Sequence, residues 1–71
     1  MNKINILIIE DLKSESEPLV DLLTKNGFNV VAVAENYKDA LKVFYKEAID
    51  LLIIDVFWSS TGVRITLIWE T

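Results

Sequence analysis

The chain has 71 residues, a formal net charge of −4, and neither cysteine nor histidine. This length allows one domain at most, and without cysteine there are no disulfides or thiolate zinc sites. The acidic balance argues against direct nucleic-acid binding, which needs a basic surface. No apolar run approaches the ~20 residues of a membrane span. No signal-peptide pattern follows the N-terminus, so we expect a cytoplasmic protein.

The first half of the sequence predicts a strand and then a helix. Residues 4–9 form an isoleucine-rich apolar run, which is typical of a strand covered on both faces in a parallel sheet. Ser14 and Glu17 have the spacing of a helix capping box. Asn26–Gly27 is a helix stop signal. We therefore expect the first helix at residues 15–25.

The next segment repeats this order of strand, helix and strand. Residues 28–34 are β-branched and apolar and predict a second strand. Asn36 and Asp39 have a cap-like spacing, and the apolar residues after them recur at helical intervals. The second helix is expected to end near Ala48, and residues 49–57 predict a third strand. Strands that alternate with helices indicate an α/β domain.

The tail differs from the rest of the chain. A strand at residues 63–69 is favoured by its β-branched and aromatic residues. A short helix remains open, although Ile65, Thr66 and Ile68 have low helix propensity. Alternate tail residues are apolar, so we expect the tail to pair with an exposed sheet edge, either its own or that of a second copy. Exchange between copies is favoured because the chain is small, and we expect a homodimer or larger species.

The predicted order of elements brings three acids to one end of the sheet. Right-handed crossovers with helices on opposite faces give the strand order 2-1-3, a doubly wound sheet. Ligands of such sheets bind outside the C-terminal ends of strands 1 and 3. Glu10 and Asp11 end the first strand, and Asp55 lies near the end of the third. Because neighbouring strands are about 4.8 Å apart, we expect the three carboxylates to meet.

Three carboxylates at one place predict a cation among them, because their charges otherwise repel one another. Oxygen ligands with room for water suit Mg²⁺. A magnesium ion beside a free carboxylate would offset the charge of a phosphoryl group, and the carboxylate could then act as a nucleophile. A role for Glu10 and Asp11 as acids at the positive end of the first helix is the alternative.

Four stretches within residues 4–57 together carry a family resemblance: "ILIIED", "LLTKNGFNVV", "AENYKDALKVF" and "DLLIIDVF". With them the chain resembles the receiver domain of two-component response regulators, which has a flavodoxin-like fold. The resemblance implies that Glu10 and Asp11 bind Mg²⁺ and that Asp55 is the phosphoacceptor and a further ligand. The backbone carbonyl of Phe57 would complete the metal site. The phosphoryl donor would be a phosphohistidine on a histidine kinase or phosphotransfer protein.

The sequence also departs from the receiver pattern. A complete receiver has five strands, with a Ser or Thr after the fourth and a Lys after the fifth that contact the phosphoryl group. No lysine follows Lys46, and we assign neither Arg64 nor Thr66 to those roles. Residues 58–71 diverge, so we expect one incomplete receiver-like domain over residues 1–71.

Two functions follow from this sequence. The first is a phosphoacceptor module whose phosphorylation is impaired, with no enzymatic activity beyond Mg²⁺-dependent self-phosphorylation. The alternative is an interaction module that keeps receiver architecture without phosphorylation. A nucleotide-binding βαβ unit is excluded, because it needs glycines where this chain has "EDLKSES".

Overall fold

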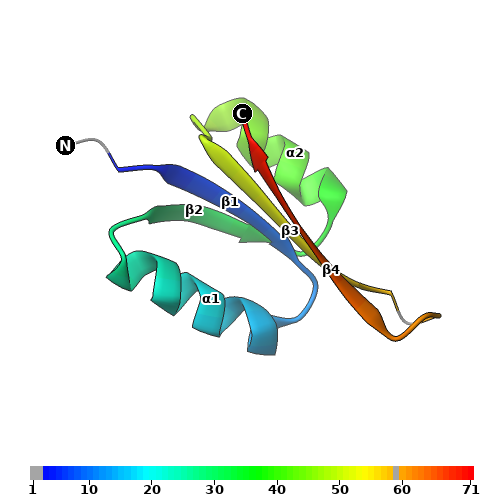
Figure 1. Ribbon diagram of the computed structural model, residues 1–71. Coiled ribbons are helices and arrows are strands. Elements are labelled where there is room, and N and C mark those ends of the chain that lie inside the picture. The colour runs from blue at the N-terminus through cyan, green and yellow to red at the C-terminus, as the bar shows by residue number, and fades with distance from the viewer. Residues whose placement is uncertain (1–2, 59) are drawn as a thin grey trace.

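The computed structural model describes residues 3–58 and 60–71, without the side chains of residues 56–58. Four strands form one sheet in the order β2-β1-β3-β4, in which β4 alone is antiparallel to its neighbour (Figure 1). The elements in chain order are β1 (Asn5–Glu10), α1 (Lys13–Lys25), β2 (Asn29–Ala34), α2 (Tyr37–Lys46), β3 (Leu51–Trp58) and β4 (Val63–Glu70). The predicted α/β fold with its 2-1-3 core, consistent with a flavodoxin-like receiver fold, is confirmed.

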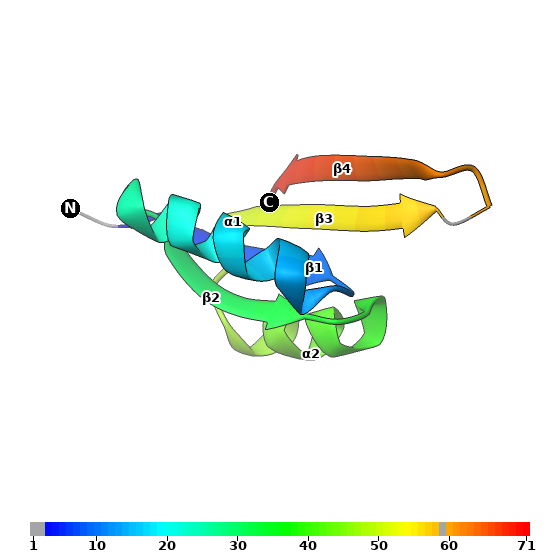
Figure 2. The ribbon, with the colours of Figure 1, turned by 90° about the horizontal axis from the view of Figure 1, so that it is seen from below.

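The two helices cover opposite faces of the sheet (Figure 2). Successive side chains of a strand point to opposite faces, so β1 supplies both layers of the core. On the α1 side, Ile6, Ile8 and Ile53 pack against leucine and valine side chains of that helix. On the α2 side, Leu7 and Ile9 pack with residues that include Ala34 of β2 and Ala40 of α2. The isoleucine-rich run at the start of the chain is therefore the centre of the domain.

The helix boundaries test the capping predictions. Asn36 caps α2, because its side-chain oxygen accepts the backbone N–H of Asp39 at 2.9 Å. The expected capping box at Ser14 is wrong. Helix α1 begins at Lys13, two residues earlier than predicted, and its N-cap, Leu12, makes no side-chain cap. Gly27 has a φ of +86°, which a glycine adopts without strain, so the predicted stop signal is confirmed.

The tail forms β4, a strand from Val63 to Glu70 that pairs along its whole length with β3 of the same chain. This is the intramolecular form of the two expected pairings. Exchange of the tail between copies stays a prediction. Gly62, in the turn just before β4, has a φ of +70°, which a glycine adopts without strain. Neither of the described helices is long and apolar enough to cross a membrane.

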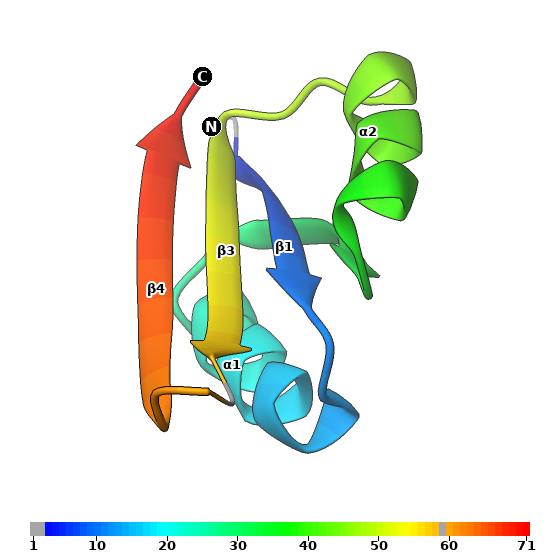
Figure 3. The ribbon, with the colours of Figure 1, turned by 90° about the vertical axis from the view of Figure 1, so that its right-hand side faces the viewer.

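Strand β4 lies at one edge of the sheet and away from both helices. Figure 3 shows it on the far side of β3 from β1 and α2. Almost every β4 residue is exposed, including Leu67, Ile68 and Trp69. Neither helix packs against β4. The strand is consequently held by its backbone pairing with β3 and by a few polar contacts.

Candidate functional site

The candidate site lies where β1 ends beside the C-terminal half of β3. Glu10 is the last residue of β1 and stands directly opposite Asp55 of β3 in the parallel register. The carboxyl ends of parallel neighbours meet at one edge of the sheet, so the predicted approach of these two acids occurs. Glu10 is only 2% exposed, and the Asp55 side chain is 14% exposed. Two carboxylates are thus placed together with little access to water.

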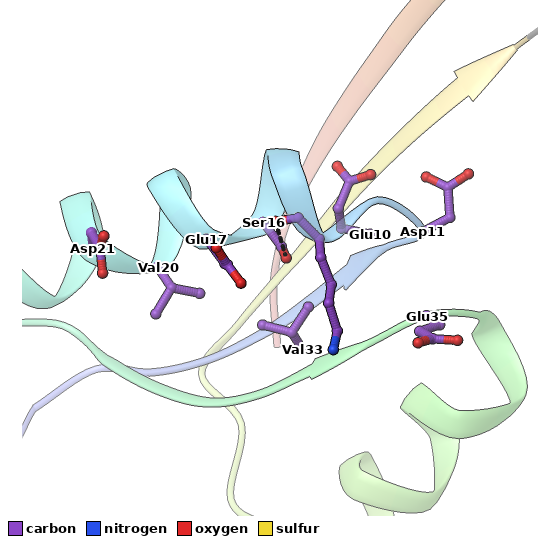
Figure 4. Close-up of a pocket in the computed structure, with 9 residues that line it drawn as sticks. Glu10, Asp11, Ser16, Glu17, Val20, Asp21, Val33 and Glu35 are labelled. Carbon is purple, nitrogen blue, oxygen red and sulfur yellow. Dashed lines mark hydrogen bonds between the residues drawn. The ribbon is translucent and has the colours of Figure 1, made fainter.

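The other two predicted ligands are placed differently. Asp11 begins the turn into α1 and is exposed; Figure 4 shows its carboxylate beside that of Glu10, at the end of β1. Phe57 lies two residues beyond Asp55 in β3, and its backbone pairs with Arg64 of β4. Its side chain lies outside the described residues. Within the described part of the chain, no three acidic side chains come close enough together to hold a metal ion.

A basic side chain from the tail lies between the two buried acids. Nη1 of Arg64 donates to Oδ1 of Asp55 at 2.9 Å and to Oε2 of Glu10 at 3.1 Å. Thr66 adds a hydroxyl donor, which lies 3.2 Å from the same Oδ1 of Asp55. The strand register explains both contacts, since Thr66 stands opposite Asp55 and Arg64 stands two residues away on the same face of the sheet.

Burial and these contacts shift the pKa values of the two acids in opposite directions. Burial raises the pKa of Glu10. The N–H of Leu12, which donates to Oε1 of Glu10 at 3.1 Å, lowers that pKa, but the neighbouring Asp11 and Asp55 raise it further. Burial alone would raise the pKa of Asp55 as well. Hydrogen bonds with Arg64, Glu10 and Thr66 outweigh burial and hold the pKa of Asp55 below its usual value. Asp55 is therefore the more acidic of the two carboxyl groups.

The site as arranged does not fit a magnesium ion. Carboxylate oxygens are suitable ligands in kind, but the position between Glu10 and Asp55 holds the Arg64 guanidinium. The second oxygen of Glu10 accepts the Leu12 N–H. A metal ion there would have to displace a cation that is already hydrogen-bonded to both acids. Magnesium binding at Glu10, Asp11, Asp55 and Phe57 stays a prediction that requires Arg64 to move.

A shallow cavity adjoins the site. It has a volume of about 250 Å³ and lies between α1 and the ends of β1 and β2 (Figure 4). Its lining consists of Lys13, three uncharged residues and five acids. The acids are Glu10, Asp11, Glu17, Asp21 and Glu35. Asp55 is not part of its lining. The cavity is small for an organic ligand, whose sites hold roughly 300–1,000 Å³, and its acids would repel phosphates. It gives no support to a nucleotide site.

Sequence reasoning missed Arg64 and Thr66. The alternation of apolar and polar residues in the tail could have revealed them. The apolar residues on either side of Arg64 and Thr66 occupy one face of β4, so these two residues share the other face. The position of Thr66 opposite Asp55 depends further on the connection between β3 and β4, and no capping or periodicity rule fixes that connection. A hairpin drawn with Trp58 opposite Val63 would have placed both residues beside Asp55.

Comparison with known proteins gives one relative of clear similarity. Over 51 residues, which are 72% of this chain, the sequence is 39% identical to the chemotaxis protein CheY of Bacillus subtilis (strain 168). The aligned part is 42% of that protein, so the chain spans less than half the length of the relative it matches. No family model matches the chain, and no solved structure matches it. The similarity agrees with the receiver-like sheet order described above.

Proposed function

We propose that this chain is a phosphoacceptor module of the receiver type in a cytoplasmic two-component pathway. Asp55 would accept a phosphoryl group from a phosphohistidine on a histidine kinase or phosphotransfer protein. The observation that carries the proposal is the placement of Asp55, in the C-terminal half of β3, opposite Glu10 at the C-terminal end of the adjacent parallel strand β1. Ligands of doubly wound sheets bind at this position. The partial similarity to CheY supports the same function.

The electrostatics of Asp55 suit a nucleophile. Its pKa is held below the usual value, despite burial, by hydrogen bonds with Arg64, Glu10 and Thr66, so its carboxylate is charged at neutral pH. The guanidinium and hydroxyl beside it are donors that can stabilise negative charge developing on a phosphoryl group. Both donors already bind Oδ1 of Asp55 in the resting state. We therefore expect phosphorylation to be slow and to stop short of full occupancy.

A mass measurement tests this proposal. The folded protein is incubated with a small acyl phosphate, and intact mass spectrometry should show a gain of one phosphoryl group. Asp55→Asn should abolish the gain, whereas Asp21→Asn, which changes an exposed carboxylate of α1, should leave it unchanged. A phosphoryl group that is still acquired by the Asp55→Asn protein would show that the assignment is wrong.

The alternative function is an interaction module with receiver architecture and no phosphorylation. One observation favours it: Arg64 and Thr66 of the same chain already satisfy the carboxylate of Asp55. A folded protein that gains no mass with the acyl phosphate, with or without Mg²⁺, would support this alternative over the phosphoacceptor.

We further propose that the module associates with a second copy through β4. The strand is a sheet edge, and edges of this kind template pairing with another strand. Val63, Ile65, Leu67 and Trp69 lie exposed on one of its faces and carry no charge. Sedimentation at micromolar concentration should show a dimer or larger species, and Leu67→Lys should shift it to the monomer. A protein that is monomeric at every concentration would contradict this proposal.

A further inference from the structure

Arg64 binds its two acids as a bridging cation does. One nitrogen atom, Nη1, lies 2.9 Å from Oδ1 of Asp55 and 3.1 Å from Oε2 of Glu10. These two carboxylates come from neighbouring strands in direct register. Nη1 of Arg64 thus contacts one oxygen of each acid, as a metal ion between the two carboxylates would.

The two acids need such a cation because of where they lie. Glu10 is almost fully buried and faces the carboxylate of Asp55, so the pair would carry like charges with little water to screen them. Burying an uncompensated charge is costly, and a paired cation offsets that cost. The guanidinium of arginine is always charged and presents several donors to carboxylates, which makes it suitable for this place.

We infer that Arg64 is a built-in substitute for a divalent cation: it occupies the position between Glu10 and Asp55, and divalent ions bind strongly there only after it is removed. The inference concerns metal binding alone. It stands whether or not Asp55 accepts a phosphoryl group, so its failure and the failure of the proposed function are separate results.

The attachment of Arg64 to the sheet makes it a strong competitor. Its strand pairs with β3 from Leu51↔Glu70 to Trp58↔Val63, so the guanidinium is held next to the acids. A tethered group acts at an effective concentration on the order of millimolar or above. A free ion must compete with this tethered cation, and must also shed part of its hydration shell, to take the same place.

The test compares divalent-ion binding in the wild type and in Arg64→Gln. Thermal unfolding is followed by circular dichroism during a MgCl₂ titration, with NaCl at equal ionic strength as the reference. Arg64→Gln should show a saturable rise in Tm, because an ion that binds only the folded state stabilises it. The apparent Kd of the wild type for Mg²⁺ should be higher than that of Arg64→Gln by about tenfold or more, and tenfold corresponds to about 1.4 kcal/mol of binding free energy.

Two further variants locate the effect. Thr66→Val removes the hydroxyl from Asp55 but leaves the guanidinium in place, so its Mg²⁺ affinity should stay as weak as that of the wild type. The double variant Arg64→Gln with Asp55→Asn should lose the affinity gained by Arg64→Gln. In NMR spectra, Mn²⁺ should broaden the amide signals of Glu10 and Asp55 in Arg64→Gln and spare them in the wild type.

Arg64→Gln alone could unfold, because it leaves two acids uncompensated. Recovery of its folded circular dichroism signal by Mg²⁺, but not by NaCl, would then support the inference. Arg64→Lys, which keeps one positive charge, provides a folded comparison and should bind Mg²⁺ with intermediate affinity. An Arg64→Gln protein that binds Mg²⁺ no more tightly than the wild type, or one that neither binds the ion nor refolds with it, would overturn the inference.

Discussion

Strands β1 and β4 are both rich in isoleucine and leucine, yet they are held in the fold by different means. Residues 6–9 of β1 are at most 7% exposed and pack under both helices. In β4, Ile68 is 66% exposed, and neither helix packs against that strand. The difference shows that position in the sheet, and not apolar composition, decides whether a strand contributes to the core. In β4, backbone pairing and the contacts of Arg64 and Thr66 take the place of packing.

The strongest test of this comparison is the same substitution in both strands. Ile8→Ala removes a side chain that is 0% exposed, so it should lower the free energy of unfolding by about 2–5 kcal/mol. Ile68→Ala changes a surface position and should stay within about 0.5 kcal/mol. Urea denaturation of the two variants and the wild type gives both values.

A small domain could unfold completely with Ile8→Ala, so Ile8→Val is the milder companion, with an expected loss of about 0.5–1.5 kcal/mol. Equal losses for Ile8→Ala and Ile68→Ala would mean that β4 is packed as β1 is. The distinction between the two strands would then be wrong.

A second test removes the polar attachment of β4. In Arg64→Ala, the strand loses its contacts with Glu10 and Asp55, so its amides should exchange with solvent several-fold faster while those of β1 change less. Lys42→Ala is the matched control. It removes a basic residue whose ion pair with Asp39 is long, at 3.9 Å, and exposed, and such pairs contribute little. Uniform acceleration in both strands would indicate that Arg64 stabilises the whole domain and not the attachment of β4.

The central part of the fold could be predicted from the sequence because local rules decide it. An apolar run with no polar alternation requires cover on both faces. Right-handed crossovers that place one helix on each face then give the 2-1-3 order. The same two rules bring Glu10 and Asp55 together, because each acid follows the apolar run of a strand in the parallel core. Asn36 was predictable as a cap because its partner, Asp39, is three residues away.

The rest depended on geometry that no local pattern specifies. Ser14 has a capping spacing, but α1 begins at Lys13, and this leaves Ser14 inside the first turn. Arg64 reaches Glu10 across 54 positions of sequence, through the register of a hairpin whose turn carries few signals beyond Gly62. The sequence therefore predicted a site with acidic residues and no basic one. Arg64, which compensates their charge, was missed because its position depends on this hairpin.

The last test uses pH, because the stabilising contributions of Glu10 in β1 and of Asp55 beside β4 change with pH in opposite directions. The folded-state pKa of Asp55 lies below the unfolded value of about 3.9. Its contribution is present above that value and is lost as the pH falls through the folded pKa. The folded-state pKa of Glu10 lies above the unfolded value of about 4.3, so its contribution is present below that value and is lost as the pH rises through the folded pKa.

Together these shifts predict a stability maximum in mildly acidic solution, near the unfolded values of the two acids, with a decline on each side. Urea denaturation between pH 3 and 8, an interval that spans roughly both unfolded values, measures the curve. Glu10→Gln should flatten the decline toward neutral pH, and Asp55→Asn should flatten the decline toward acid, because each removes one titrating group. The expected differences are smaller than those of the core variants, since other carboxylates titrate in the same interval. A wild-type curve that keeps rising to neutral pH and is unchanged by Glu10→Gln would mean that Arg64 compensates the buried acid completely.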